Sequence, residues 1–272
     1  MRYFIQLSYN GNPYHGWQRQ PNAVTVQQTI EEALSTILRQ PTTIMGAGRT
    51  DTGVHAQMMY AHVDMENTMV DGADTTLSQD DPNGGEACEL AFAKADLENL
   101  TYKLNNLLPS SIAIQGIFPV EADAHARFDA VSRTYIYKLS PHKNPFSENQ
   151  TYYYRPFLDF DKMNTAAKIL LDYNDFECFS KVQTEVRTYL CTITHAAWKK
   201  VDDEWHFTIS ADRFLRNMVR AIVGTLIEIG RDKQSPEWMH EVLRSKSRSM
   251  AGASAPAHGL YLQTIIYPEK IV

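Results

Sequence analysis

The sequence is poor in cysteine, with three in 272 residues. Cys88, Cys178 and Cys191 are odd in number and form no C-x-x-C pair, which argues against a disulfide framework and against a structural zinc site. We therefore expect all three to be free thiols.

Long apolar runs are absent as well. No stretch approaches the roughly 18 consecutive apolar residues that a membrane span requires. The first residues, MRYFIQLSYNGNPYHGW, alternate apolar and polar side chains, so they contain no hydrophobic region of a signal peptide. With 43% hydrophobic residues, the chain can nevertheless bury one core or two. The sequence therefore predicts a soluble, cytoplasmic protein without a membrane segment.

Positive charge is also scarce, because the formal net charge is -6. An acidic surface would repel the phosphates of a nucleic acid. The deficit comes from one segment, since between Asp64 and Glu98 there are ten acidic residues against a single lysine, Lys94. The rest of the chain holds 25 basic and 22 acidic residues, so its formal charge is +3. We interpret residues 66–95 as an acidic insertion that forms a long loop before a helix near residue 96.

The alternation and spacing of apolar residues predict strands and helices in both halves of the chain. Strands are expected at residues 2–11, from about 42, at 53–65, 111–120, 130–140 and 259–268, and as a hairpin over 188–214 with its tip at Asp202–Asp203. Helices are expected at residues 25–40, 95–109, 160–173, 214–230 and 235–246. Thr25 and Ser235 are the expected N-caps, and Gly230 is expected to end its helix. These elements predict two α+β domains, residues 1–107 and 108–272.

A glycine-flanked acidic turn stands out at residues 45–56, MGAGRTDTGVHA. Gly46, Gly48 and Gly53 let the backbone adopt conformations that other residues resist, and they allow another molecule to approach closely. The turn lies between two expected strands, where functional residues are often mounted on a rigid scaffold. One interpretation is a site built around Asp51. The alternative is an ordinary turn in which Asp51 caps its own backbone.

Five blocks of sequence carry a more specific signal than this turn alone. They are GWQRQ at 16–20, GAGRTDTGVHA at 46–56, HARFDAVSRTYIYKL at 125–139, FLRNMVRAIVGTL at 214–226 and APAHGLYL at 255–262. In this order, and over almost the whole chain, the blocks resemble the tRNA pseudouridine synthase A (TruA) family. Only the acidic insertion departs from the shorter connection that is usual in the family.

The resemblance implies an isomerase that converts uridine to pseudouridine at positions 38 to 40 of the tRNA anticodon stem-loop. In this reaction the bond between ribose C1′ and uracil N1 breaks, the base turns in the pocket, and C1′ rejoins at C5. The chemistry is redox-neutral and adds no atoms, so it needs no cofactor. This agrees with a sequence that lacks a dinucleotide fingerprint, a P-loop and a cluster of metal ligands.

The resemblance also implies an architecture and partners. We expect an α+β fold of two similar halves, whose mixed or antiparallel sheets join into one long sheet. Helices would pack on one face of this sheet, and a central cleft would bind RNA. The implied protein is a homodimer that binds tRNA. The family gives no guidance for the acidic insertion, but its charge would repel RNA, so we expect it at an edge or on the far side.

Asp51 matches the essential aspartate of the family. As a carboxylate it can attack an electrophilic carbon or take a proton from the sugar, and the sequence leaves both routes open. A carboxylate in a dry pocket tends to take up a proton unless a cation compensates its charge. We expect Arg49, two residues away, to supply that cation and so to belong to the catalytic set.

Tyr135 matches the tyrosine that stacks on the target uracil in the family, and it completes the expected catalytic set of Asp51, Arg49 and Tyr135. An extruded base loses the stacking of its neighbours, and an aromatic face offsets part of that loss. Tyr137 should share a strand face with Tyr135, but we expect it only to pack.

Arginines in the matched blocks are the expected contacts to tRNA phosphates, because guanidinium groups form paired hydrogen bonds with phosphate oxygens. They are Arg19, Arg127, Arg133, Arg213, Arg216 and Arg220. Arg216 and Arg220 are four residues apart on one face of an expected helix, so one of them could instead pair with Asp51. We expect His55 and His125 to be hydrogen-bonded structural residues rather than acid–base catalysts.

Two other functions stay open on the sequence alone. The D-x-x-x-H spacing of Asp51 and His55 allows a metal-dependent hydrolase, which would require a divalent metal. A catalytically silent RNA-binding protein of the same fold would bind tRNA and leave its uridines unchanged.

Overall fold

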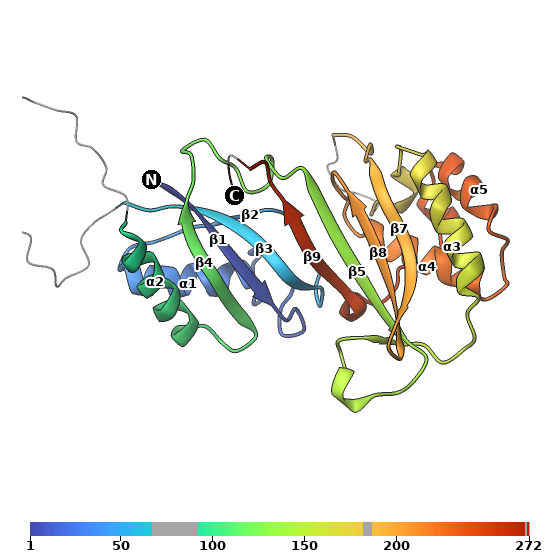
Figure 1. Cartoon of the computed structure of the whole chain (residues 1–272), viewed down its shortest axis with the longest axis horizontal. Helices are drawn as coiled ribbons and strands as arrows, with labels where there is room; N and C mark the ends of the chain where they lie inside the picture. Colours follow the sequence, from blue (N-terminus) through green and yellow to red (C-terminus); the bar gives the residue numbers. More distant parts are fainter. Residues whose placement is uncertain (67–91, 182–186, 270, 272) are drawn as a thin grey trace, which may run out of the picture.

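One long β-sheet runs through the molecule, with helices at both ends (Figure 1). This computed structural model describes residues 1–66, 92–181, 187–269 and 271. Most of the acidic insertion lies outside the described residues, as does Cys88. Cys178 and Cys191 are buried free thiols, as expected. Among the described residues, no helix is both long and apolar enough to cross a membrane.

The sheet has the strand order β4-β1-β3-β9-β5-β8-β7, with β2 added to β3 and β6 added to β5. The strands are β1 (Arg2–Tyr9), β2 (Met45–Gly46), β3 (His55–Asp64), β4 (Ile112–Pro119), β5 (Ser132–Ser140), β6 (Tyr152–Tyr153), β7 (Ile193–Val201), β8 (Glu204–Ala211) and β9 (Leu260–Ile266). Most neighbours are antiparallel, but β3 and β9 are parallel, as are β5 and β6. The predicted α+β class with one large mixed sheet is confirmed.

The helices flank the two ends of this sheet. They are α1 (Val26–Leu38), α2 (Lys94–Leu107), α3 (Phe160–Ile169), α4 (Met218–Gly230) and α5 (Trp238–Ser245). In Figure 1, α1 and α2 lie at the end formed by β4, and α3, α4 and α5 lie at the end formed by β7. Short 3₁₀ turns occur at Pro145–Ser147, Leu170–Asp172, Glu177–Phe179, Arg248–Met250 and Ala257–Gly259.

A first hydrophobic core joins α1 and α2 to β1, β3 and β4. Alternate residues of β1, Tyr3, Ile5 and Leu7, are fully buried in one cluster with Ile30 and Leu34 of α1. The period of two in the strand and of four in the helix are the spacings that place these side chains on one face of each element. Strand β4 pairs with β1 and contributes to this core.

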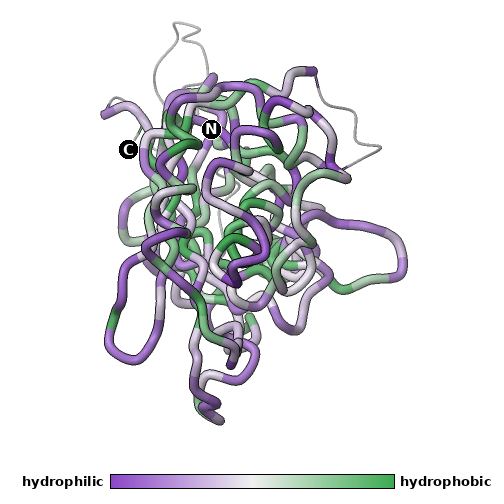
Figure 2. The backbone as a smooth tube through the Cα atoms, turned by 90° about the vertical axis from the view of Figure 1, so that its right-hand side faces the viewer, coloured by the Kyte–Doolittle hydropathy of each residue, from purple (hydrophilic) through white to green (hydrophobic). Residues whose placement is uncertain are grey.

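A second core surrounds α4, the most apolar of the described helices. Ile222, Val223 and Leu226 are fully buried and share a cluster with Phe207 and Ile209 of β8. Figure 2 views the molecule from this end and shows hydrophobic segments gathered inside, with hydrophilic segments in the projecting loops. The sheet therefore carries one core near each end. The domain boundary between residues 107 and 108 stays a prediction.

Strand β9 connects the two ends of the sheet. It pairs with β5 from Ser132 to Tyr137, but its pairing with β3 comprises only His55 with Tyr261 and Ala56 with Leu262. The strand pairing between the two ends is therefore short and lies at the start of β3. The glycine-flanked turn that precedes β3 is held at this junction.

The expected helix over residues 214–230 begins later than predicted. Asn217 has a left-handed backbone conformation with φ of 67°, and α4 begins at the next residue, Met218. Arg216 therefore lies in the turn before α4, so the prediction that Arg216 and Arg220 share one helical face is wrong. An apolar pattern marks the buried face but does not show where a left-handed residue interrupts the helix.

Other expected boundaries have mixed outcomes. Thr25 caps α1, and Gly230 is the last residue of α4, both as predicted. Ser235 does not cap α5, because its carbonyl accepts from Trp238 N–H in a preceding turn and the helix begins at Trp238. The strand expected from residue 42 is reduced to Met45–Gly46, since the residues before it hydrogen-bond to α1 instead.

Candidate active site

The loop that carries Asp51 connects β2 with β3 and is fixed on both sides of the carboxylate. Val54 N–H donates to the Asp51 carbonyl over 3.1 Å, which closes the turn. Trp17 N–H donates to the Thr50 carbonyl over 3.2 Å, and the hydroxyls of Tyr9 and Thr50 are 2.8 Å apart. The carboxylate of Asp51 is therefore presented from a rigid turn.

At two positions in and beside this loop the structure requires glycine, each for a different steric reason. Gly53 has a φ of +79°, a conformation that residues with side chains rarely adopt. At Gly46, a Cβ atom would lie 2.4 Å from the ring of Trp17. At Gly48, no atom lies within 4 Å of that position. Gly46 thus makes room for Trp17 rather than for a nucleotide, whereas Gly48 borders open space.

Two arginines from the other end of the chain flank the Asp51 carboxylate. Arg220 Nη1 lies 3.3 Å from Asp51 Oδ2, and Arg216 Nε lies 3.7 Å from Oδ1. The side chains of Asp51 and Arg220 are 23% and 21% exposed, while that of Arg216 is 55% exposed. Arg220 Nε also donates to the Ala255 carbonyl over 2.7 Å, which fixes its guanidinium. Two guanidinium groups therefore lie beside the carboxylate of Asp51.

The expected ion pair between Arg49 and Asp51 is not found among the described residues, and the place of Arg49 in the catalytic set stays a prediction. Within the part of the chain that the structure describes, the ion pairs of Asp51 are those with Arg216 and Arg220. Arg49 is exposed, and its guanidinium lies near that of Arg127 instead. Neighbouring positions in a turn do not bring two side chains together when their directions diverge.

Tyr135 lies close to this ion pair, as the resemblance predicted. It is half-buried on β5, and its ring meets that of Phe214 edge to face at 5.1 Å between centroids. Burial raises the pKa of Tyr135 to about 12, and the negative charge of Asp51 adds to this rise. The phenol is therefore neutral at physiological pH. Tyr137 is fully buried, and its hydroxyl donates to the Pro256 carbonyl over 2.9 Å, so its predicted packing role is confirmed.

The chain is similar to known proteins over its whole length. A family described as tRNA pseudouridine synthase matches residues 166–268. The tRNA pseudouridine synthases A of Parabacteroides distasonis, Porphyromonas gingivalis and Bacteroides fragilis are 49%, 50% and 46% identical to the chain. Each alignment covers 99% of this chain and 97% or 98% of the relative. The chain belongs to the tRNA pseudouridine synthase A family. The family predicted from the five sequence blocks is confirmed, and with it a tRNA pseudouridine synthase, which is an isomerase.

The remaining arginines expected to bind phosphate in this tRNA pseudouridine synthase differ in their surroundings. Arg19 pairs with Glu31 at 3.2 Å, with 58% of its side chain exposed. Arg133 donates to four main-chain carbonyls, which favours a structural role over phosphate binding. Arg127 and Arg213 form no ion pair among the described residues, so they are free to meet an anion. Their contacts with tRNA stay predictions.

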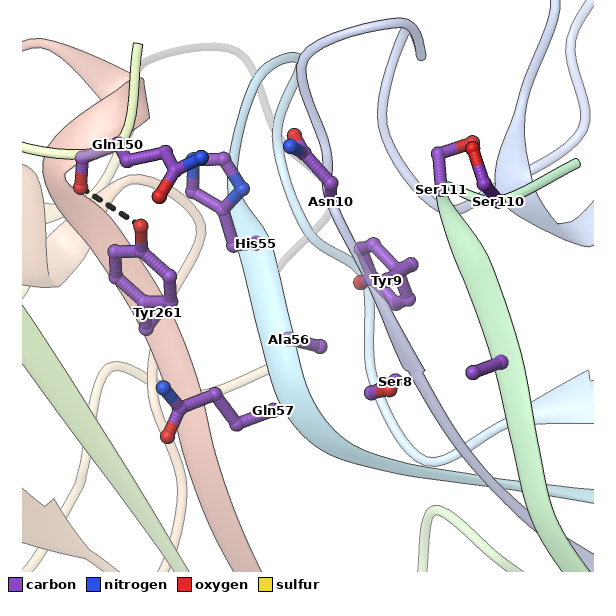
Figure 3. Close-up of a pocket in the computed structure, with 11 residues that line it drawn as sticks. Ser8, Tyr9, Asn10, His55, Ala56, Gln57, Ser110, Ser111, Gln150 and Tyr261 are labelled. Carbon is purple, nitrogen blue, oxygen red and sulfur yellow. Dashed lines mark hydrogen bonds between the residues drawn. The ribbon is translucent and has the colours of Figure 1, made fainter. Parts of the chain in front are cut away.

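Both ring nitrogens of His55 are already engaged. Gly11 N–H donates to Nδ1 over 3.1 Å, and Nε2 lies 3.1 Å from the His258 carbonyl, to which it donates. The ring also stacks on Tyr261 at 4.5 Å. Figure 3 shows His55 and Tyr261 on the wall of a pocket whose lining does not include Asp51. A hydrolase that used His55 as a metal ligand would have to break these bonds, so the geometry favours the predicted structural role.

His125 also has a structural position. Its Nδ1 accepts hydrogen bonds from the N–H groups of Arg127 and Phe128 at 3.1 and 3.4 Å, which fixes the turn before β5. Its ring meets His62 edge to face at 4.6 Å. His62 is nearly buried, and its Nδ1 accepts from Ala126 N–H over 3.1 Å.

The surroundings of His62 predict that the free energy of unfolding of this protein depends on pH. Burial, followed by the charge of Arg2, lowers the pKa of His62 to about 4, below its ordinary value of 6.5. Between these values the unfolded chain binds more protons, so stability is full above pH 6.5 and falls as the pH drops towards 4. We expect His62→Asn, which retains an acceptor but cannot titrate, to reduce the stability difference between pH 7 and 4.5 by about 2 kcal/mol. Urea denaturation at both pH values measures this.

The exposed His195 supplies a matched control for this experiment. His195→Asn should leave the pH dependence as in the unaltered protein. If His62→Asn and the unaltered protein lost the same stability between pH 7 and 4.5, His62 would not be the group responsible for the loss.

Some contributors to the site were not predicted from the sequence. Phe214 supports the ring of Tyr135, and the Ala255 carbonyl fixes Arg220. Both residues lie in the matched blocks, but a backbone carbonyl has no sequence signature, and Phe214 reads equally well as a core residue. Trp17, from the first block, was likewise not linked to the Asp51 loop.

Proposed function

We propose that this tRNA pseudouridine synthase isomerises uridine to pseudouridine at positions 38 to 40 of the tRNA anticodon stem-loop, with Asp51 as the reacting carboxylate. The observation that carries the proposal is the carboxylate of Asp51 between the guanidinium groups of Arg220 and Arg216, beside the half-buried ring of Tyr135. A partly buried ionised carboxylate and an aromatic face are what the reaction needs at its sugar and its base, respectively.

Two chemical routes are compatible with this geometry. Asp51 can attack ribose C1′ and displace uracil N1, or it can take a proton from the sugar so that the C1′–N1 bond breaks. In the first route the Asp51–C1′ bond breaks as C1′ bonds to C5, and in the second route the sugar regains its proton once C1′ has bonded to C5. Either route ends when C5 loses its proton to solvent and N1 takes up a proton. Arg216 and Arg220 pair with the carboxylate and hold it in place for this step, and Tyr135 offers a face to the extruded uracil. No electrons are exchanged, so we propose no cofactor.

We further propose that tRNA lies across the junction between the two ends of the sheet, in a central cleft. The arrangement of the reacting groups supports this placement. Asp51 comes from residues 1–107, while Tyr135, Arg216 and Arg220 come from residues 108–272. A substrate that contacts all of them has to bridge the two proposed domains. We place the protein in the cytoplasm, where its tRNA substrate is found.

A homodimer forms part of the proposal, because a chain with a small excess of positive charge outside its insertion has to bind a large polyanion. Light scattering at micromolar concentration should give a mass of about 62 kDa, twice the 31.0 kDa of one chain. A mass of 31.0 kDa under these conditions would contradict the homodimer without affecting the proposed chemistry.

The proposed function is tested by incubating the purified protein with a tRNA transcript in the presence of EDTA and then mapping pseudouridine by position. We expect pseudouridine at one or more of positions 38 to 40, and unmodified uridine elsewhere. A silent RNA-binding protein would bind the transcript and form none. A metal-dependent hydrolase would be inactive in EDTA and would cleave its substrate when a divalent metal is restored. Either of these two results would overturn the proposal.

A further inference from the structure

Three arginines without carboxylate partners converge beside the Asp51 loop. Arg49 lies two residues before Asp51, Arg127 lies in the turn before β5, and Arg213 lies in the connection from β8 to α4. Arg49 and Arg127 are exposed, and Arg213 is half-buried. Within the described parts of the chain, none of the three forms an ion pair. Their charges are therefore available to a ligand.

One half-buried guanidinium, that of Arg133, ties the three segments together. Arg133 Nη2 donates to the Arg127 carbonyl over 2.6 Å and reaches the Ala47 carbonyl at 3.5 Å. Its Nη1 donates to the carbonyls of Asp212 and Ala130 over 2.7 and 2.9 Å. Ala47 is two residues from Arg49, and Asp212 directly precedes Arg213. Arg133 thus holds the backbones that carry all three arginines around a single point.

Repulsion among the positive charges of these three arginines points to an anionic ligand. Burial lowers the pKa of Arg127, and the nearby charges of Arg49 and then Arg213 lower it further. Like charges held together destabilise a fold unless something compensates them. No carboxylate of the described residues forms an ion pair with any of the three arginines, so an anionic ligand could compensate their charges.

An exposed aromatic ring identifies the kind of anion. Phe128 is 73% exposed, yet its ring is backed by that of His125 at 4.3 Å between centroids. The Arg127 guanidinium lies 5.6 Å from the centroid of the same ring. A supported aromatic face beside clustered guanidinium groups suits a nucleotide, since it offers stacking for a base and charge for a phosphate. Inorganic phosphate would use only the charges.

We propose that Arg49, Arg127 and Arg213 form a cradle for one phosphodiester of the RNA strand near the target uridine, and that Phe128 stacks on an adjacent base. Arg133 is the positioning residue of this cradle and does not itself contact the phosphate. The proposal rests on the proposed function, because it takes the anticodon stem-loop as the bound RNA.

The cradle is tested by pairing charge removal on the protein with charge removal on the RNA. Anticodon stem-loop RNAs that each carry one uncharged methylphosphonate linkage are titrated with the unaltered protein, Arg127→Gln and Arg213→Gln. We expect one linkage near the target uridine whose neutralisation weakens binding to the unaltered protein about tenfold, but to either variant less than about twofold. Each variant should also lower the slope of log Kd against log salt by about one.

The exposed Lys199 on β7 provides a control with the same change of charge. Lys199→Gln should retain the full tenfold effect of the neutralised linkage. The cradle is overturned if the protein and RNA changes are additive at every linkage near the target, or if Arg127→Gln and Arg213→Gln behave like Lys199→Gln.

Two further variants test Phe128 and Arg133. Phe128→Leu should weaken binding about tenfold, and Phe128→Tyr should restore it, because stacking needs the ring. Arg133→Lys keeps the charge but cannot reach four carbonyls, so it should abolish the effect of the one cradle linkage and leave the effects of distant linkages unchanged. A uniform loss at all linkages would instead indicate general unfolding and would overturn the positioning role.

The cradle and the proposed function can fail separately. If pseudouridine forms but the arginine substitutions are not coupled to any neutralised linkage, only the cradle is wrong. If the arginine substitutions and the neutralised linkage are coupled but no pseudouridine forms, the proposed activity is wrong and the cradle remains an RNA-binding site.

Discussion

Replacing Asp51 with asparagine should abolish pseudouridine formation while leaving tRNA binding nearly intact. Asparagine has a similar size and shape but no carboxylate, so the chemical step loses its nucleophile or base. We expect the single-turnover rate to fall by at least about 10⁴-fold, which corresponds to roughly 5 kcal/mol of activation free energy. Phosphate contacts provide most of the affinity, so the Kd for tRNA should change less than about threefold.

Two controls make this result specific. Asp51→Ala should be as inactive as Asp51→Asn, which guards against activity from asparagine that reverts to aspartate. Asp203→Asn removes an exposed carboxylate at the tip of the β7–β8 hairpin and should keep the normal rate. Turnover of Asp51→Asn or Asp51→Ala within tenfold of the unaltered protein would rule out Asp51 as the reacting group.

The two arginines beside Asp51 should contribute unequally to catalysis. Arg220 is mostly buried, lies 3.3 Å from the carboxylate and is fixed by the Ala255 carbonyl, whereas Arg216 is more exposed and lies 3.7 Å away. A charge interaction in a drier, better fixed site is less screened by solvent. We expect Arg220→Met to lower the single-turnover rate about 10²-fold, and Arg216→Met less than about tenfold.

Arg220→Lys separates charge from geometry at the same position. Lysine keeps a cation near Asp51 but cannot also bind the Ala255 carbonyl through a second nitrogen, so its rate should lie between those of the unaltered protein and Arg220→Met. Thermal unfolding of each variant checks that α4 remains folded. Equal losses in Arg216→Met and Arg220→Met, or an Arg220→Met rate within threefold of normal, would contradict the unequal roles.

The turn that carries Asp51 could be found from the sequence, but the sequence did not decide which of Arg49, Arg216 and Arg220 pairs with it. Glycines and a charged pair between two strands mark the turn, but only the resemblance to the family assigns Asp51 to the chemistry. Arg49 is the nearest cation in the chain, yet the side chains that reach Asp51 come from Arg216 and Arg220. Their approach depends on how β9 and β5 bring the second end of the sheet to the start of β3, which no local pattern encodes.

Arg133 illustrates a second limit of prediction from sequence. A guanidinium has the same donors whether it binds a phosphate or the carbonyls of its own chain. Four carbonyls surround Arg133 because residues near Ala47, Arg127 and Asp212 converge on it in the folded protein. By contrast, the strands and helices themselves follow from apolar spacing. They were largely predicted, apart from boundaries such as the late start of α4 at Met218.

Release of tritium from a tRNA transcript labelled at C5 of uridine tests the role of Asp51 most directly. Bonding of C1′ to C5 displaces the C5 hydrogen, so each isomerised uridine releases one tritium to water. With enzyme in excess and EDTA present, we expect the unaltered protein to release as many tritium atoms as there are uridines modified at positions 38 to 40. Asp51→Asn, equally saturated with tRNA, should release no more than the background. Release by Asp51→Asn at the normal rate, or no release by the unaltered protein bound to its transcript, would contradict Asp51-dependent isomerisation.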